Sequence, residues 1–103
     1  MVVVIVQIPI PPRPRAEAIE QATASAPTYR ALAARGLLKK YYLNGAAGGG
    51  GVYLWRSRTE AENWYNDAWR ANMKARFGAE PGLTYYDSWV TVDNIGGATL
   101  VEA

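Results

Sequence analysis

Four side chains between residues 65 and 76 have the types and the spacing expected of a binding wall. They are Tyr65, Trp69, Asn72 and Arg76. Spacings of i, i+4, i+7 and i+11 align them along one edge of a helix. In a pocket, the aromatic rings would hold a flat ligand and Asn72 would orient it through a hydrogen bond. The same set is also typical of the boundary between the buried and exposed faces of a helix. There the aromatic rings would be buried and Arg76 would extend over them to solvent.

One helix over residues 58–77 would position this edge. Ser57 and Glu60 form a capping box, in which the Ser57 hydroxyl accepts from the Glu60 N–H and the carboxylate reaches back. Gly78 is a suitable C-terminal stop. At about 100° per residue, the core-facing stripe consists of Ala61, Trp64, Ala68 and Ala75. The polar edge borders this stripe, where an unsatisfied Asn would be costly.

Aromatic and basic side chains on the predicted strands are further candidates for substrate binding. They are Lys40, Tyr41, Tyr53 and Trp55. Tyr53 and Trp55 share one face of their strand, because side chains two residues apart point the same way. The alternation does not decide which parity faces the helices, so both faces are open as locations for the site.

Asp87 lies between aromatic residues in the last predicted strand. It is the only acid inside a predicted strand apart from Asp93 at the strand's end. Cross-strand pairing with Lys39, Lys40 or Arg56 would give Asp87 a structural role. Alternatively, a carboxylate with a perturbed pKa at this position would act as a catalytic base. The sequence leaves both roles open.

The order of elements predicts a single α+β domain over residues 1–103. We expect strands at 2–8, 37–44, 52–57 and 83–93, and helices at 15–35 and 58–77. This βαββαβ order is typical of ferredoxin-like domains, in which two helices cover one face of a four-stranded antiparallel sheet. Pro27 predicts a kink or a break in the first helix, which should end at Gly36. The tail at 94–103 suits either a short extra strand or a segment laid across a partner.

Residues 45–51, GAAGGGG, lie between two predicted strands, which indicates a hairpin loop. A phosphate-binding P-loop would need Lys and then Ser or Thr before a helix, whereas Val52, Tyr53 and a strand follow here. A mobile lid over a site is favoured over a phosphate cradle, because glycine runs are flexible.

Composition excludes several classes of site. The chain has no Cys and no His, which excludes thiolate nucleophiles, disulfides, zinc sites with N and S ligands and His-ligated haem within one chain. A net charge of +2 without a sustained basic run is not typical of nucleic-acid binding. The apolar start, MVVVIVQIPIPP, is too short for a membrane span and lacks a signal-peptide layout. We therefore expect a cytoplasmic protein with neither nucleic acid nor membrane as a partner.

The predicted sheet has one face that no helix would cover. The first strand, VVVIVQI, is apolar on both parities, and the Tyr- and Trp-rich strands share this property. A second copy packed sheet against sheet would bury the bare face. The sequence therefore predicts a homodimer that forms through its sheet faces.

The stretch GGVYLWRSRTEAENWYNDAWRANMKARFG, with LLKKYYLN before it and YYD after it, resembles the YdhR-type monooxygenase family. That family belongs to the dimeric α+β barrel superfamily, with the antibiotic-biosynthesis monooxygenases as relatives. The resemblance covers residues 25–93. It implies a homodimer with a ligand cavity between sheet and helices in each subunit. The haem-degrading branch uses a His that this chain lacks, whereas the cofactor-free quinone-forming branch uses the Asn, Trp and Tyr types present here.

From this resemblance we expect a cofactor-independent monooxygenase that acts on a small aromatic, phenolic or polyketide-like substrate, with O₂ as co-substrate. The deprotonated substrate would reduce O₂ itself, while the protein binds it, stabilises the anion and excludes water. Asn72 would orient the substrate, and Tyr65 or Asp87 would move the proton. Arg76 or Lys40 would stabilise the anion. Alternative functions are a cyclase or isomerase on the same scaffold, and a non-catalytic binding or assembly module.

Overall fold

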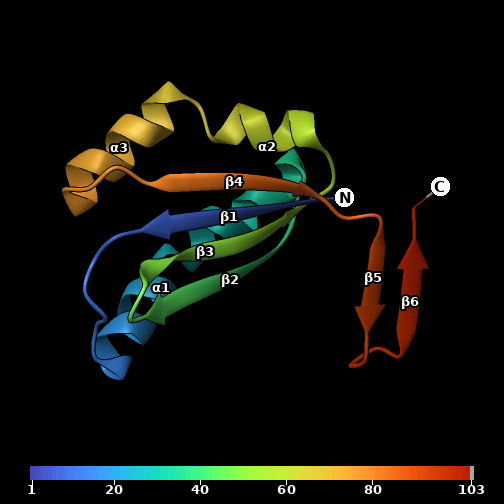
Figure 1. Ribbon diagram of the computed structural model, residues 1–103, viewed down its shortest axis with the longest axis horizontal. Helices are drawn as coiled ribbons and strands as arrows, with labels where there is room; N and C mark the ends of the chain where they lie inside the picture. Colours follow the sequence, from blue (N-terminus) through green and yellow to red (C-terminus); the bar gives the residue numbers. More distant parts are fainter. Residues whose placement is uncertain (103) are drawn as a thin grey trace.

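A four-stranded antiparallel sheet forms the centre of the computed structural model, which describes residues 1–102 (Figure 1). Its strands are β1 (Val2–Ile8), β2 (Leu37–Gly45), β3 (Gly48–Trp55) and β4 (Gly82–Asp87). They follow the spatial order β2-β3-β1-β4. β1 therefore has a hydrogen-bonded neighbour on each side, which suits its run of Val and Ile.

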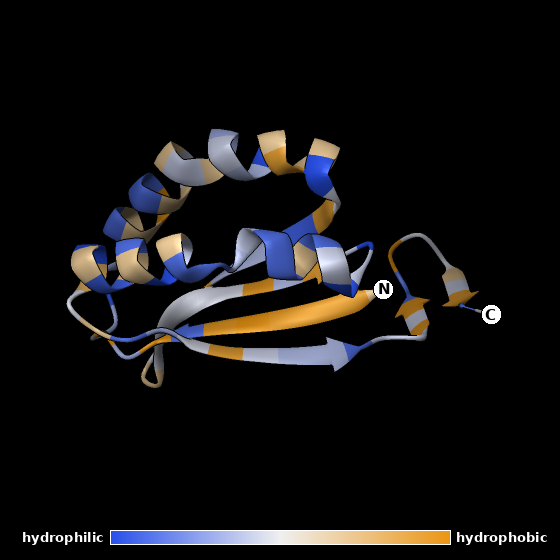
Figure 2. Ribbon diagram, turned by 90° about the horizontal axis from the view of Figure 1, so that it is seen from above, coloured by the Kyte–Doolittle hydropathy of each residue, from blue (hydrophilic) through white to orange (hydrophobic). Residues whose placement is uncertain are grey.

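The helices all lie on one side of this sheet (Figure 2). They are α1 (Arg15–Ala31), the 3₁₀ segment η1 (Leu32–Arg35), α2 (Arg58–Trp64) and α3 (Asp67–Phe77). Within residues 1–102, none of them has the length and apolar character needed to cross a membrane. The mixed α+β class predicted from the sequence is confirmed, together with the four-stranded antiparallel sheet.

The core lies between the sheet and the helices. The even-numbered residues of β1 are buried there, together with Trp55 of β3 and Trp69 of α3. The odd-numbered residues Val3 and Ile5 are only partly buried, because they point to the side of the sheet that no helix in the described residues covers. One face of β1 is thus core and the other is open.

α1 is one helix rather than two, although Pro27 lies inside it. The predicted break at Pro27 is therefore not found. A proline removes one backbone donor, and here the helix surface around it is exposed, so water can satisfy the carbonyl that loses its partner. The predicted stop at Gly36 is confirmed, because this residue follows η1 in the left-handed conformation with φ of 100°.

The prediction of one continuous helix over 58–77 is wrong. α2 ends at Trp64, and a new helix begins at Asp67 after Asn66. The Asn66 side chain accepts a hydrogen bond from the Trp69 N–H at 2.9 Å, which is the geometry of an N-cap. The acidic side chain of Asp67 in the first turn further favours a helix start at this point.

This break changes which side of the second half faces the core. Ala68 and Ala75, predicted to lie in the core stripe, are exposed. Trp69, Met73 and Phe77 face inward instead, at intervals of four residues along α3. Ala61 in α2 is fully buried as predicted, since it precedes the break. The helical phase counted from Ala61 therefore does not carry past residue 66.

The predicted hairpin is present, but most of the glycine run belongs to its second strand and not to its loop. β2 ends at Gly45 and β3 begins at Gly48, so the loop is only two residues long. Gly48 and Gly50 have φ of 123°, which glycine alone adopts readily. A Cβ on Gly50 would overlap the Val6 carbonyl oxygen of β1. Glycine is required because the two backbones approach too closely for any side chain, and the paired strand cannot act as a lid.

The last predicted strand, 83–93, also divides. β4 ends at Asp87, and a separate hairpin follows, formed by β5 (Val90–Asp93) and β6 (Ala98–Val101). The tail therefore contributes a short strand, one of the two alternatives that the sequence left open. Figure 1 shows this hairpin projecting beyond the end of the main sheet. An ion pair between the Met1 amino group and Glu102 holds its base near the start of β1.

Replacement of Gly50 by Ala tests the close approach of β3 to β1. We expect Gly50→Ala to lower the free energy of unfolding by about 2 kcal/mol or more, because Ala is strained at this φ. Gly45→Ala is the matched control, since a Cβ there meets no atom within 4 Å. Urea denaturation of both variants measures the difference, and equal stabilities would contradict the required close approach.

Candidate functional site

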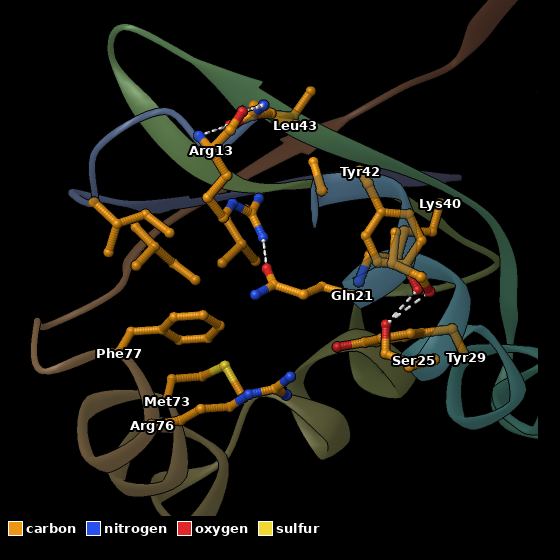
Figure 3. A pocket seen from close by; sticks show the side chains of 18 of the residues that line it. Arg13, Gln21, Ser25, Tyr29, Lys40, Tyr42, Leu43, Met73, Arg76 and Phe77 are labelled. Atoms are coloured by element: carbon orange, nitrogen blue, oxygen red, sulfur yellow. Dashed lines mark hydrogen bonds between the residues drawn. The ribbon is translucent and has the colours of Figure 1, made fainter. Parts of the chain in front are cut away.

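A cavity of about 800 Å³ lies between α1, the helix-facing side of the sheet and α3 (Figure 3). Its volume is in the range of small-molecule sites, which are mostly apolar hollows with a few polar groups. Val6 of β1 and Met73 and Phe77 of α3 contribute apolar walls. Polar groups come from α1, β2, β3 and α3, and from the connector between β1 and α1.

The cavity exists because small residues replace bulky ones on two of its walls. Gly49 and Gly51 occupy helix-facing positions of β3. A Cβ on Gly51 would lie 3.0 Å from Tyr53 Cε1 and 3.1 Å from Lys40 Cε, so glycine leaves room for both side chains. The facing wall of α1 carries Ala18, Ala22, Ala24 and Ser25. Space for a ligand thus follows from glycine in the strand and alanine in the helix.

Lys40 points into a cage of three tyrosine rings. Its Nζ lies 3.3 Å from the ring centroid of Tyr29 and 3.9 Å from that of Tyr42. A third ring, from Tyr53, is 4.7 Å away on the neighbouring strand. Burial, with a smaller effect from the positive charge of Arg76, lowers the pKa of Lys40 to about 7. Near neutral pH the amine is therefore present in both its charged and its neutral form.

A hydroxyl pair links the cage to α1. The Ser25 hydroxyl donates to the Ala22 carbonyl at 3.1 Å and lies 2.8 Å from the Tyr42 hydroxyl. If Ser25 donates its only proton to the carbonyl, Tyr42 is the donor in the second bond. This bond holds the Tyr42 ring in place beside Lys40. Burial also raises the pKa of Tyr29, so this phenol stays protonated at neutral pH.

The charges around the cavity have one sign. Arg13, Lys40 and Arg76 all line it, and no Asp or Glu from residues 1–102 does. Clefts lined by one sign of charge in a poorly polar surrounding raise the local concentration of the opposite charge. The site therefore favours a ligand that is anionic or becomes anionic when bound.

Four of the residues predicted from the sequence line this cavity. They are Lys40, Tyr53, Trp69 and Arg76, which come from β2, β3 and α3. Figure 3 shows Lys40 and Arg76 on different walls of the same space. From Lys40 onward, the even-numbered residues of β2 face the helices, and so do the odd-numbered residues of β3. The sequence alone had left open which set of residues faces the helices.

Two predicted residues lie in the core and do not line the cavity. Trp55 is 0% exposed, and its indole N–H donates to the Tyr65 hydroxyl at 3.1 Å. The Tyr65 ring also packs edge-on against Trp69, with a centroid distance of 4.9 Å. Burial raises the pKa of Tyr65, which favours the neutral phenol. These contacts give Tyr65 and Trp55 a packing role in the structure.

The other three predicted residues are exposed and lie apart from the cavity. Asn72 is on the solvent side of α3, because the break at residue 66 turns it outward. Asp87 ends the edge strand β4 and makes no ion pair with any described residue, Lys39, Lys40 and Arg56 included. Tyr41 is 57% exposed on the open face of the sheet.

The residues of the site that sequence reasoning missed include Arg13, Tyr29 and Tyr42. Arg13 lies in a proline-rich connector, where no periodic pattern indicates the direction of a side chain. Tyr29 had a signal that could have found it. It shares a helix face with Ala18, Ala22 and Ser25, and so many small residues facing a sheet indicate a space left unfilled.

Comparisons with known proteins give no assignment. No protein-family model matches the chain, and no curated protein matches it in sequence.

Substitution of Tyr65 separates a packing role from a catalytic one. We expect Tyr65→Phe to lower the free energy of unfolding by about 1–3 kcal/mol, because the buried Trp55 N–H loses its acceptor. Tyr86→Phe is the control, since Tyr86 is exposed and its hydroxyl has no hydrogen-bond partner among residues 1–102. Chemical denaturation measures both. A Tyr65→Phe protein as stable as the wild type would contradict the packing role.

Proposed function

We propose that the protein is a cofactor-independent monooxygenase that oxidises a small phenolic substrate in the cavity between α1, the sheet and α3. The observation that carries this proposal is the Lys40 amine, which three tyrosine rings surround in a cavity that Arg76 also lines. A flat aromatic ligand suits the aromatic and apolar walls, and the positive charges suit its anion. O₂ is the co-substrate.

The first step is removal of the phenolic proton. The neutral Lys40 amine accepts this proton, since a general base works best when its pKa is close to the operating pH. The resulting ammonium and the Arg76 guanidinium then stabilise the phenolate. Lys40 takes this role in the proposal in place of Tyr65 and Asp87. The Tyr65 hydroxyl is bound in the core and Asp87 is exposed at the sheet edge.

The second step is oxidation of the phenolate by O₂. The phenolate gives one electron to O₂, and the resulting radicals combine at a ring carbon to form a peroxide. The ring C–H proton and the proton held by Lys40 then leave with one oxygen atom as water. The other oxygen atom stays on the ring, so a phenol with a free para position and O₂ give a quinone and water. The apolar side chains of Val6, Met73 and Phe77 reduce the contact of the radical pair with water.

Substitution of Lys40 tests this mechanism. We expect Lys40→Met to lower kcat/KM for phenol-dependent O₂ uptake by about 10²–10⁴-fold, the usual contribution of a general base. Lys40→Arg should not restore activity, because a guanidinium does not lose its proton. In the wild type, kcat/KM should rise with pH around a pKa of about 7, where the amine becomes neutral. An O₂ electrode and a panel of electron-rich phenols provide the measurement.

Lys39→Met is the matched control, since Lys39 precedes Lys40 in β2 and is exposed. This variant should keep wild-type rates. O₂ uptake that is unchanged in Lys40→Met would contradict the proposed base. Turnover of the phenols without O₂ consumption would favour a cyclase or isomerase, and binding without turnover would favour a non-catalytic module.

We also propose that two copies pair through the open faces of their sheets, as in the dimeric α+β barrels that the sequence resembles. The antiparallel order β2-β3-β1-β4 with all helices on one face supports the ferredoxin-like topology of that superfamily. On the open face, Ile5 pairs with Val52, and Val3 pairs with Leu54. Apolar rows of this kind on a surface are typical of interfaces.

The hairpin of β5 and β6 gives a second reason for a partner copy. Its exposed apolar residues are Val90, Val92, Leu100 and Val101. An isolated two-stranded hairpin is marginally stable in water, so a surface that covers its side chains would stabilise it. The sheet face of a second copy is such a surface.

A charge on the open face tests the dimer. We expect Val52→Glu to shift the protein from dimer to monomer, because pairing would bury an unpaired carboxylate. Thr23→Glu on the exposed surface of α1 is the control and should remain dimeric. Light scattering coupled to size-exclusion chromatography measures the mass. A wild-type protein that is monomeric at high concentration would contradict the proposed assembly.

A further inference from the structure

We propose that the ligand of this cavity carries a carboxylate, or a similar oxyanion, that binds to the guanidinium of Arg13. The inference rests on the proposed function, because it assigns a second functional group to the same phenolic substrate. The class of substrate would then be an aromatic hydroxy acid, with its phenol at Lys40 and its acid group at Arg13.

The backbone around Arg13 is fixed without help from its side chain. The Arg13 N–H donates to Asn44 Oδ1 at 3.0 Å, and the Asn44 amide donates back to the Arg13 carbonyl at 2.9 Å. These two bonds hold the connector against the end of β2. The guanidinium is therefore not needed to anchor the chain, and it extends into the cavity (Figure 3).

Only one side of this guanidinium is occupied. Nη1 donates to Gln21 Oε1 of α1. Nε is buried without a partner, and Nη2 has no hydrogen bond to any residue in the described range 1–102. Nε and Nη2 form the edge through which arginine binds a carboxylate with two parallel hydrogen bonds. The unpaired donors of Arg13 thus match the acceptors of a carboxylate, which reaches the buried Nε once the guanidinium turns toward the cavity.

The strand beneath the guanidinium is free of side chains. A Cβ on Gly49 would lie 3.4 Å from Arg13 Nη2 and 3.2 Å from Ile10 Cδ1. Glycine at this position lets the guanidinium lie against the strand. It also leaves no polar side chain there to compete for the donors.

No acid among residues 1–102 neutralises Arg13. Within residues 1–102 it makes no ion pair, and Glu17 bonds to Gln21 at 3.3 Å instead. The Trp69 indole, which also lines the cavity, has a buried N–H without a partner. The cavity therefore holds an excess of donors and positive charge, and a ligand that brings acceptors and negative charge would satisfy both.

Two naphthols that differ in one group test this assignment. Calorimetry on the wild type should show 6-hydroxy-2-naphthoic acid binding at least about tenfold tighter than 2-naphthol, since a charge-assisted pair supplies that much. Arg13→Met should remove this advantage, so that the two naphthols bind the variant with similar affinity. Arg13→Lys should retain only part of it, because an ammonium cannot bind a carboxylate through two parallel bonds.

Arg15→Met is the matched control, since Arg15 is two residues away, exposed and outside the cavity wall. It should preserve the preference for the acid. Equal binding of the two naphthols to the wild type, or equal effects of Arg13→Met and Arg15→Met, would overturn the carboxylate assignment while leaving the phenol site standing. Failure of both naphthols to bind the folded wild type would overturn the phenol site as well. A 6-phosphono-2-naphthol, which keeps the free phenol, would support a site for oxyanions in general if it binds as tightly as the acid.

Discussion

The close approach of β3 to β1 is the constraint on which the rest of the structure depends. At Gly50 the two backbones leave no room for a Cβ, so this part of β3 has to be glycine. Once the strand is glycine-rich, Gly49 and Gly51 leave the helix-facing side of the sheet without side chains at two positions. The space they vacate receives Arg13 and Lys40. Sheet pairing and the binding cavity thus both depend on glycines of this one strand.

This arrangement divides the molecule into a well-packed end and a loosely packed end. Trp55, Tyr65 and Trp69 form a buried aromatic cluster at one end, joined by edge-on ring contacts and one hydrogen bond. α1 buries none of its side chains, and specific polar contacts such as that between Ser25 and Tyr42 link it to the sheet. Cavities lower stability because their walls lose packing contacts. The aromatic cluster supplies the stability that the end with the cavity lacks, and motion of α1 would admit a ligand.

Local signals predicted most of the fold, and they failed where tertiary packing decides the backbone. Uninterrupted apolar residues indicated β1, and the capping box at Ser57 indicated the start of α2, because both signals are local. The Asn66 cap was present in the sequence, but an Asn inside an apparently continuous helical pattern has an ambiguous role. We counted helical positions continuously across Asn66. We therefore predicted Asn72 beside the pocket and Ala75 in the core. The glycine run indicated a loop by composition, because only the neighbouring strand shows why a paired strand needs glycine.

The charge on Lys40 links stability to ligand binding. The pKa of this amine is about 7 in the folded protein, below its usual value near 10.5. Between those two pH values the unfolded chain binds the proton and the folded chain does not, so stability rises with pH across that window. Below pH 7 the charge is present in the folded state, where the tyrosine faces attract it while its lost hydration and Arg76 oppose it. A bound phenolate would supply the missing counter-charge and raise the pKa of Lys40 again. The charge that opposes the burial of Lys40 is thus the charge that an anionic ligand would neutralise, and no acidic residue of the described chain lines the cavity to neutralise it first.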